Sequence, residues 1–331
     1  MDNAILRVVD LTKHFAVPVP FRLSDLFGKR QYKTLKAVDG VRFDVNARET
    51  LGLVGESGCG KTTIGRLILR AIDPTTGQIL FQQRPIERLT GKELLDFRKH
   101  VQVVFQDPFL SLNPRMTVKR ILGEPLRVHR IVSQEAMADK TVALLELVGM
   151  DPHLSSCYPY ELSTGQRKRV AVARAIATNP TLLVADEAVS GLDVSVKAQI
   201  LNLLSDLQET LGLTYLFISH DLAVVQFVCH KVAIMYLGKI VEFGPTKMIF
   251  ENPLHPYTVA LLKSIPKVRA IGEPPTPIHS PLRGEIPSPI DLPRGCRFQA
   301  RCQKRMAICE ESEPPMTEVN SEQRVSCFLY K

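Results

Sequence analysis

Residues 55–63 read GESGCGKTT, and this stretch decides the fold. It fits the pattern G-x-x-x-x-G-K-[ST]. Before it stands ETLGLVG (49–55), an apolar run typical of a buried strand, and after it TTIGRLILRAI (62–72) carries an apolar helical stripe. A glycine-rich turn between a strand and a helix directs backbone N–H groups and the positive helix end at one anion. The sequence therefore predicts a phosphate-binding loop.

The residue types in this loop suit a nucleotide with Mg²⁺. Lys61 is placed to offer its ammonium to the β- and γ-phosphates, and Thr62 to offer its hydroxyl to Mg²⁺. A chance glycine-rich turn would not need the strand before it and the helix after it. We expect ATP to contact the whole loop, namely Gly55, Glu56, Ser57, Gly58, Cys59, Gly60, Lys61, Thr62 and Thr63.

A pair of acids follows a second apolar strand, TLLVAD (181–186). Asp186 ends this strand, where an acid can hold Mg²⁺, and Glu187 can orient or deprotonate an attacking water. Two carboxylates can also simply end a strand. Beside a phosphate loop, we assign the pair to nucleotide hydrolysis.

The wider pattern predicts an α/β fold. Strand and helix signals alternate over the first 250 residues, which indicates parallel strands covered by helices, and mostly helical text near 107–180 indicates an inserted helical subdomain. From about residue 266 the chain changes character, and residues 271–294 hold seven prolines. Proline removes backbone donors and fixes φ, so this stretch is expected to be an extended strap. The predicted domains are 4–265 and 266–331.

Composition is that of an ordinary globular protein, with 45% hydrophobic and 23% charged residues. The longest apolar runs, such as VALLELVGM (142–150), are too short to span a membrane, and the N-terminus lacks a secretory signal. We therefore expect a cytoplasmic protein. The net charge of +8 is compatible both with anionic partners and with mere solubility.

Further motifs follow in a fixed order: Phe15 in LTKHF, Gln106 in VVFQD, LSTGQ (162–166), SGLD (190–193) and His220 in FISHD. With the phosphate loop, their order and spacing over residues 4–265 resemble the nucleotide-binding subunit of ATP-binding-cassette (ABC) transporters. The resemblance implies a RecA-like core with an antiparallel β subdomain and an inserted helical subdomain. It also implies an ATPase coupled to transport.

The resemblance is strongest to the dipeptide/oligopeptide (peptide/nickel/opine) import branch. VFQDPFLSLNPRMTV, DVSVKAQILNLL and NPLHPYTVALL all read like that branch, and so does the proline-rich tail with spaced cysteines. The resemblance thus covers nearly the whole chain. The transported cargo is not specified by this sequence.

In that family two subunits close around two ATP molecules, each held between one subunit's phosphate loop and the other's signature. By resemblance, Gln106 contacts Mg²⁺, His220 contacts the γ-phosphate, and Phe15 stacks on adenine, with Phe21 and Tyr32 as rivals. Thr164 replaces the usual signature glycine, and its β-branched side chain is expected to weaken that composite site. The implied contacts of the signature and crossing loop are Ser163, Thr164, Gly165, Gln166 and Asp193.

The implied partners are a second, different ATPase subunit, two transmembrane permease subunits and an extracytoplasmic solute-binding protein, met at the cytoplasmic face of the cell membrane. A soluble regulatory or nucleic-acid-associated ATPase of the same family is the alternative. No nucleic acid is expected, because basic patches interleaved with aromatics are lacking.

Four of the seven cysteines lie in the tail with the spacing C-x5-C-x6-C-x17-C. ATP use implies a reducing compartment, which argues against disulfides. Zinc usually takes a C-x2-4-C pair, which is missing, so iron–sulfur ligation, zinc and no metal all stay open. The resemblance implies a [4Fe–4S] cluster held by Cys296, Cys302, Cys309 and Cys327.

Overall fold

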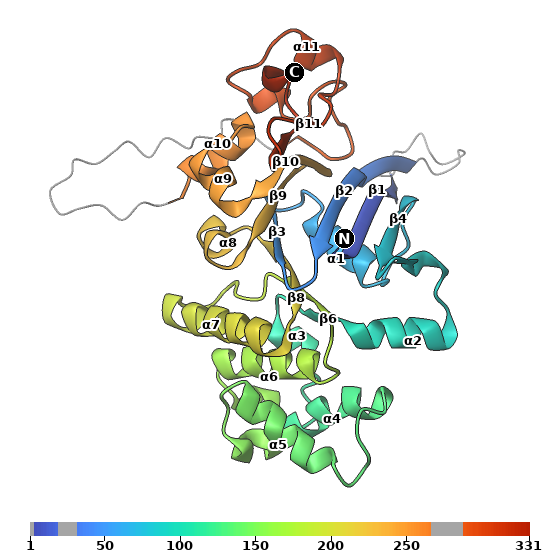
Figure 1. Cartoon of the computed structure of the whole chain (residues 1–331), viewed down its shortest axis with the longest axis vertical. Coiled ribbons are helices and arrows are strands. Elements are labelled where there is room, and N and C mark those ends of the chain that lie inside the picture. The colour runs from blue at the N-terminus through green and yellow to red at the C-terminus, as the bar shows by residue number, and fades with distance from the viewer. Residues whose placement is uncertain (1–2, 19–31, 266–286) are drawn as a thin grey trace, which may run out of the picture.

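The computed structural model describes residues 3–18, 32–265 and 287–331. Its largest element is a mostly parallel sheet (Figure 1). Within the described residues its strands are, in spatial order, β11 (Thr317–Glu318), β12 (Arg324–Val325), β10 (Lys239–Pro245), β9 (Lys231–Tyr236), β3 (Thr50–Val54), β8 (Thr214–Ser219), β7 (Leu182–Asp186) and β6 (Val101–Val104). The strands from β9 to β6 are parallel, and β10, β12 and β11 extend the sheet antiparallel.

A second, antiparallel sheet packs beside the first one (Figure 1). Its strands, in spatial order, are β2 (Tyr32–Asn46), β1 (Ala4–Pro18), β4 (Thr76–Phe81) and β5 (Arg84–Pro85). Apolar side chains of this sheet and of α1 (Lys61–Ile68) share one buried core with the inner strands of the parallel sheet.

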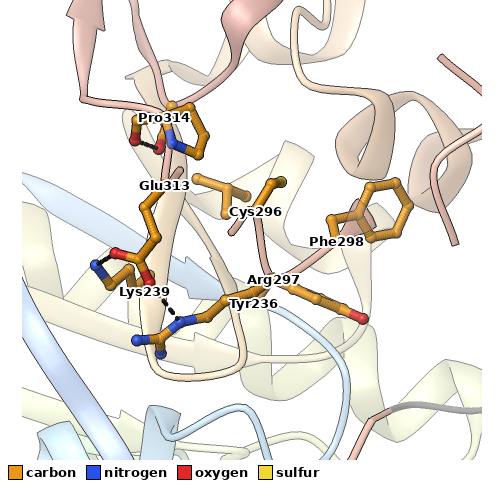
Figure 2. Close-up of a pocket in the computed structure, with 9 residues that line it drawn as sticks. Tyr236, Lys239, Cys296, Arg297, Phe298, Glu313 and Pro314 are labelled. Atoms are coloured by element: carbon orange, nitrogen blue, oxygen red, sulfur yellow. Dashed lines mark hydrogen bonds and ion pairs between the residues drawn. The ribbon is translucent and has the colours of Figure 1, made fainter. Parts of the chain in front are cut away.

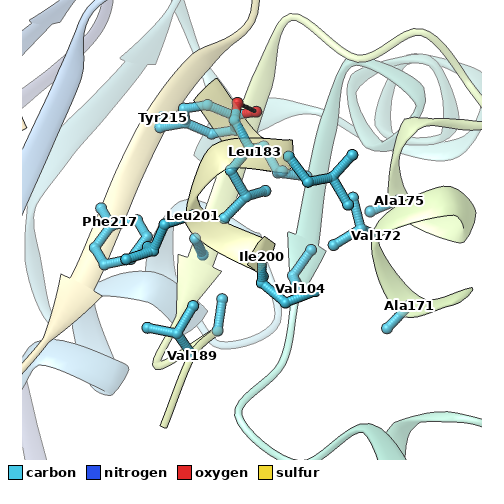
Figure 3. Packing of buried hydrophobic residues seen from close by; sticks show 14 of the residues in the cluster. Val104, Ala171, Val172, Ala175, Leu183, Val189, Ile200, Leu201, Tyr215 and Phe217 are labelled. Atoms are coloured by element: carbon cyan, nitrogen blue, oxygen red, sulfur yellow. Dashed lines mark hydrogen bonds between the residues drawn. The ribbon is translucent and has the colours of Figure 1, made fainter. Parts of the chain in front are cut away.

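A group of helices forms the far end of the molecule, beyond the parallel sheet (Figure 1). These helices are α3 (Pro108–Ser111), α4 (Val118–Val128), α5 (Met137–Leu147), the short 3-10 helices η3 (Pro152–Ser156) and η4 (Pro159–Glu161), and α6 (Thr164–Ile176). Small residues on α6, such as Ala171 and Ala175, allow this helix to pack closely against its neighbours (Figure 3). Helix α7 (Val194–Leu211) contributes its own residues Ile200 and Leu201 to the same buried cluster.

Shorter elements complete the described structure. They are η2 (Ile86–Arg88), α2 (Gly91–His100), α8 (Leu222–Val228), α9 (Thr246–Glu251), α10 (Pro256–Lys263), η5 (Gln299–Arg301), α11 (Ile308–Glu311) and η6 (Phe328–Tyr330).

The predicted α/β fold, with a parallel sheet and an inserted helical region, is confirmed. β9 and β10 form a hairpin, and Leu237 and Gly238 between them both have positive φ, as a tight two-residue hairpin turn requires. The helix expected over 62–72 ends earlier, at Ile68, because Arg70 adopts a positive φ of 53°. The proline-rich stretch lies mostly outside the described residues.

The two strands contributed by the tail were not predicted. β12 pairs with β10, so residues near the C-terminus lengthen the central sheet rather than forming a separate unit. Gln323 strengthens this join because its buried amide donates to Glu242 on β10 at 2.9 Å and to the Asn252 carbonyl at 3.1 Å.

One buried histidine stands at the same junction. The backbone N–H of His255 donates to Glu242 Oε2 at 2.9 Å, and His255 Nδ1 accepts from the Tyr257 N–H at 3.0 Å, which caps α10. Burial lowers the pKa of His255 from 6.5 to about 3, so the folded protein strongly favours the neutral ring.

We predict a stability loss in acid that depends on His255. The folded pKa lies below the unfolded one, so the contribution is complete above pH 6.5 and shrinks as the pH falls toward 3. The loss of this contribution between pH 7 and pH 5 should lower the free energy of unfolding by about 2 kcal/mol. Chemical denaturation at both pH values should show this difference shrinking in His255→Asn, whose amide can still cap α10 but does not titrate. His153→Asn, at an exposed site, is the control, and an unchanged pH difference in His255→Asn would contradict the assignment.

Candidate functional site

The phosphate loop has the backbone that its sequence predicts. Gly55 and Gly60 are required here, since an added Cβ would lie 2.1 Å from the carbonyl oxygens of Met235 and Ala37, respectively. Gly60 also has φ of +108° and begins α1. Lys61 is buried, and its ammonium donates to the carbonyls of Gly55 at 2.7 Å and Glu56 at 3.0 Å. The ammonium therefore sits at the centre of the loop.

The strand register brings the other motifs to this loop. Val54 pairs with Ser219 and Asp186 pairs with Ile218, so the residues that follow β3, β7 and β8 meet at one edge of the sheet. A cleft of about 720 Å³ opens there. It is lined by Phe15, Leu35, Ala37, Ser57, Gly58, Gly60, Lys61, Thr62, Thr63, Gln106, Glu187, Ser190, His220 and Pro289.

Glu187 is held by two neighbours inside this cleft. Gln106 Nε2 donates to Glu187 Oε2 at 2.8 Å, and His220 Nδ1 lies 3.1 Å from Glu187 Oε1. The backbone of Glu187 has a positive φ of 48°, an uncommon conformation for this residue type. Its N–H donates to the Ile218 carbonyl at 2.9 Å, which fixes the turn after β7. Three predicted catalytic residues thus form one hydrogen-bonded group.

Asp186 faces the phosphate loop, where its Oδ1 accepts from the Thr62 hydroxyl at 3.4 Å. Burial raises the pKa of Asp186, and the adjacent charge of Glu187 raises it further, while the Thr62 hydroxyl lowers it. A carboxylate in a setting that disfavours negative charge is stabilised by a divalent cation. The donors Asp186 and Thr62, with Gln106 across the cleft, therefore fit Mg²⁺ in chemical type.

Lys168 on α6 connects the signature helix to Gln106. Its buried ammonium donates to the carbonyls of Phe105 at 3.2 Å and Gln106 at 2.5 Å. Burial lowers the pKa of Lys168 to about 8, although Asp107 and Glu187 favour the charged form. The two bonds fix the backbone from which Gln106 reaches Glu187. No local pattern indicates this role, because an isolated lysine on a helix is usually solvent-exposed.

Of the three aromatic candidates for adenine, the structure places one in the cleft. Phe15 lines it and is partly exposed. Tyr32 lies at the far end of the β1–β2 pair, opposite Pro18, and does not line the cleft. Phe21 lies outside the described residues.

The signature residues lie apart from this cleft, at the start of α6. Ser163 caps the helix by accepting from the Gln166 N–H at 3.2 Å, and Gln166 Oε1 accepts from the Ser163 N–H at 2.9 Å. Thr164 is exposed, and its hydroxyl accepts from Arg167 at 3.1 Å. Asp193 caps α7 through the Val196 N–H at 2.9 Å. Ser163, Thr164, Gly165, Gln166 and Asp193 therefore do not meet the chain's own phosphate loop.

Two predicted loop contacts have side chains engaged elsewhere. Glu56 directs its carboxylate at Arg301 in the tail rather than into the cleft. Cys59 is buried against the loop, with its Sγ 3.8 Å from Lys61 Nζ. Leu35, Ala37, Ser190 and Pro289 also line the cleft, although none of them was predicted to contact the nucleotide. Ser190 belongs to the SGLD motif, whereas Leu35, Ala37 and Pro289 lie outside the motifs.

The four tail cysteines lie near one another. Three of them belong to residues 296–309, here called the thiol segment, and the fourth is Cys327. Cys296 N–H donates to the Cys309 carbonyl at 2.8 Å. Burial, together with the nearby Cys309, Cys302 and Cys327, raises the pKa of Cys296 to about 11. Nevertheless, within the described residues no three His, Cys, Asp or Glu side chains converge closely enough to hold a metal ion.

Among the helices that the structure describes, none is both long and apolar enough to cross a membrane.

Two models of known protein families match this chain. A sequence profile described as "ABC transporter" matches residues 38–190. A second, described as "Oligopeptide/dipeptide transporter, C-terminal region", matches residues 241–309.

Similar curated proteins span the whole chain. The chain is 47% identical over 330 residues to the oligopeptide transport ATP-binding protein AppF of Bacillus subtilis, covering 99% of this chain and 98% of that protein. It is 45% identical over 330 residues to the probable peptide ABC transporter ATP-binding protein y4tS of Sinorhizobium fredii, covering 99% and 91%.

Similar solved structures share the fold. One is cbiO1 of Clostridium perfringens, part of the ABC transporter complex cbiONQ, with a TM-score of 0.64 and 27% identity over 76% of this chain and 92% of that one. Another is the ATP-binding cassette MJ0796, a dimer in a post-hydrolysis state bound to ADP and Pi, with a TM-score of 0.63 and 25% identity over 73% and 98%.

We predict that Lys168 positions Gln106. In Lys168→Met, loss of two hydrogen bonds from a charged donor should lower ATP turnover about tenfold while nucleotide affinity changes little. Steady-state hydrolysis and a nucleotide titration would measure the two effects separately. Lys119→Met, at an exposed site on α4, is the matched control. Normal turnover by folded Lys168→Met would show that the contact is dispensable.

Proposed function

The chain belongs to the ATP-binding proteins of ABC transporters in the oligopeptide/dipeptide import family, and from this premise we propose how its residues work. It is the ATP-binding subunit that energises a peptide ABC importer, and its enzymatic activity is that of an ABC transporter ATPase. The observation that carries the residue assignments is the single cleft in which the phosphate loop, Gln106, Glu187 and His220 meet.

We propose that ATP lies in this cleft with its phosphates against residues 55–63. The loop N–H groups and the N-terminus of α1 would hold the phosphates, and Lys61 would neutralise the β- and γ-phosphate charge. Phe15 would stack on the adenine, because it lines the cleft and Tyr32 does not. Thr62 and Asp186, with Gln106, would hold Mg²⁺, which neutralises charge on the transferred phosphoryl group.

Glu187 would orient the attacking water and accept its proton. The carboxylate is already fixed by Gln106 at 2.8 Å and by His220 at 3.1 Å, so its position depends on both neighbours. His220 would also contact the γ-phosphate. Loss of that phosphate would then change the contacts of a residue that touches Glu187, which links hydrolysis to conformational change.

The signature would serve a partner's ATP. Ser163, Thr164, Gly165 and Gln166 lie at the N-terminus of α6, an arrangement suited to an anion, but away from this chain's own loop. A second subunit is therefore needed to complete each site, and Asp193 would lie near the contact between the two subunits. Opening of the closed pair after hydrolysis would be the mechanical output.

We predict that Glu187→Gln stops hydrolysis but keeps ATP binding. Removal of a general base should lower turnover at least ~100-fold, since such bases contribute 10²–10⁴-fold. Turnover in the assembled complex and ATP affinity should be measured together, with Glu209→Gln, an exposed substitution on α7, as control. Normal hydrolysis by Glu187→Gln would contradict the assignment.

Thr164 is proposed to weaken the composite site. Its β-branched side chain stiffens the signature, and its hydroxyl accepts from Arg167 at 3.1 Å, which adds a restraint that glycine lacks.

We therefore predict that Thr164→Gly raises ATP turnover of the assembled complex a few-fold. Thr164→Ser separates the causes, because serine keeps the hydroxyl that Arg167 contacts and loses the methyl group. Steady-state ATPase assays on the complex would compare the three proteins. Unchanged turnover in Thr164→Gly would mean that the threonine is neutral.

The remaining partners are also proposals. We assign the ATP-dependent partner to a different ATPase subunit, and two permease chains to the membrane, with this chain at the cytoplasmic face and a solute-binding protein outside. Residues 107–160 are proposed to receive a permease helix, because the exposed aromatics Phe109 and Tyr160 lie there. A tight ATP-dependent homodimer of Glu187→Gln, formed without a second ATPase chain, would contradict the heterodimer.

We also propose that the four tail thiols hold a [4Fe–4S] cluster. This proposal rests on the gathering of Cys296, Cys302, Cys309 and Cys327 and on the branch resemblance. A single ion requires side chains that converge on one point, which is not their arrangement. A cluster of four irons and four sulfides is larger than a single ion, so the four thiols that bind it are farther apart from one another. The cluster would tie the tail together, remote from the phosphate chemistry.

The predicted result is a brown protein with about four iron atoms per chain after anaerobic purification. Cys302→Ser should lose iron and visible absorbance, whereas Cys157→Ser, outside the thiol segment, should keep both. A colourless, zinc-loaded wild type would overturn the cluster.

A further inference from the structure

An arginine of the tail forms an ion pair with a residue of the phosphate loop. Arg301 in η5 forms a two-pronged ion pair with Glu56: Nη1 lies 2.7 Å from Oε2, and Nη2 lies 3.0 Å from Oε1. The two residues are 245 positions apart in sequence. The Arg301 side chain is only 4% exposed, against 21% for Glu56. Such a fork fixes the direction of the carboxylate as well as its distance.

Every polar group of Glu56 is held by a different part of the molecule. Its N–H donates to the Tyr257 hydroxyl at 3.0 Å, its carbonyl accepts from Lys61 at 3.0 Å, and its carboxylate accepts from Arg301. The carboxylate does not line the nucleotide cleft. This side chain therefore does not contact a nucleotide in the cleft, and it can act on the position of the phosphates only through the backbone of the loop.

The thiol segment packs against the same place through aromatic rings. The Phe298 ring centroid lies 5.3 Å from that of Tyr236 and 5.4 Å from that of Tyr257, and the Arg301 guanidinium lies 5.9 Å from the Tyr236 centroid. Figure 2 shows that Cys296, Arg297 and Phe298 lie near Tyr236. Arg297 adds a second link, since it pairs with Asp39 and Glu313, and Glu313 pairs with Lys239.

Burial makes the Arg301–Glu56 pair sensitive to loss of either partner. Hydrogen bonding to Glu56 raises the pKa of Arg301, so the guanidinium remains charged. Removing Glu56 would leave that charge buried without its counter-ion, and removing Arg301 would free the carboxylate to turn. Both changes loosen the second residue of the loop.

We propose that Arg301 is a positioning residue for the phosphate loop and couples the thiol segment to nucleotide binding. The coupling deepens the proposed function and rests on ATP lying against residues 55–63. Because coupling between two sites is reciprocal, nucleotide binding must in turn stabilise the thiol segment. The thiol segment is thus part of the nucleotide site's support, whatever occupies its cysteines.

A double-mutant cycle on the full-length protein tests the pair. Nucleotide dissociation constants would be measured by titration with a fluorescent ATP analogue for wild type, Arg301→Gln, Glu56→Gln and the double variant. Each single change should weaken binding about tenfold, and the double variant should be no weaker than either, because both act through one contact. Arg301→Lys keeps the charge but loses the fork, so its loss should be smaller.

The matched control is Arg305→Gln, which removes an exposed arginine of the same segment that pairs with Glu310. Its affinity should equal that of wild type. Unfolding that is in equilibrium with binding raises the apparent dissociation constant by the reciprocal of the folded fraction, so the folded fraction of each variant is measured by circular dichroism and its affinity is corrected for it. Wild-type affinity in Arg301→Gln, or additive losses in the double variant, would overturn the proposal.

Hydrogen exchange provides the reciprocal readout, which a purely structural role would not change. Nucleotide should slow amide exchange over residues 296–302 in wild type and in Arg305→Gln, but not in Arg301→Gln. Equal protection in Arg301→Gln would also overturn the coupling. Wild type that binds no nucleotide would refute the proposed site itself, and this inference with it.

Discussion

The parallel register of β3, β8, β7 and β6 is the constraint on which the site depends. Val54 pairs with Ser219, Asp186 with Ile218, and Ala185 with Val104. The segments that follow these strands are far apart in sequence, yet they must emerge at one edge of the sheet. The phosphate loop, Glu187, His220 and Gln106 meet in one cleft for that reason, and a register shift of one residue would separate them.

The same constraint explains what could be predicted from sequence. Gly55 and Glu187 directly follow buried apolar strands, and the carboxyl ends of parallel strands lie at the same edge of a sheet in whatever order the strands are arranged. Local pattern therefore indicated the phosphate loop and the acid pair Asp186 and Glu187, whereas Gln106 and His220 were assigned by the family resemblance. The order in which the strands pair was not predicted, since periodicity does not say which strands are neighbours.

Other features depend on contacts that no local pattern carries. Lys168 reaches Gln106 from α6, and Arg301 reaches Glu56 across 245 positions, so each looked like an ordinary charged residue in sequence. The short strands β11 and β12 are two residues each, too short for an alternation to be recognised. Glu56 was assigned to ATP as a loop member, whereas its carboxylate supports the loop from behind.

The tail is held on the ATPase core by specific contacts. Its strands extend the central sheet, Gln323 joins it to Glu242, and Arg301 and Phe298 join it to the phosphate loop. A tail with few apolar residues thus gains stability by packing on the ATPase core rather than by forming a core of its own.

The most direct test of this account is a structure of full-length Glu187→Gln bound to ATP and Mg²⁺. The account predicts the phosphates against residues 55–63, the adenine against Phe15, and Mg²⁺ near Thr62 and Asp186, with the Arg301–Glu56 pair intact behind the loop. ATP bound away from this cleft, or bound there with Glu56 released from Arg301, would contradict it.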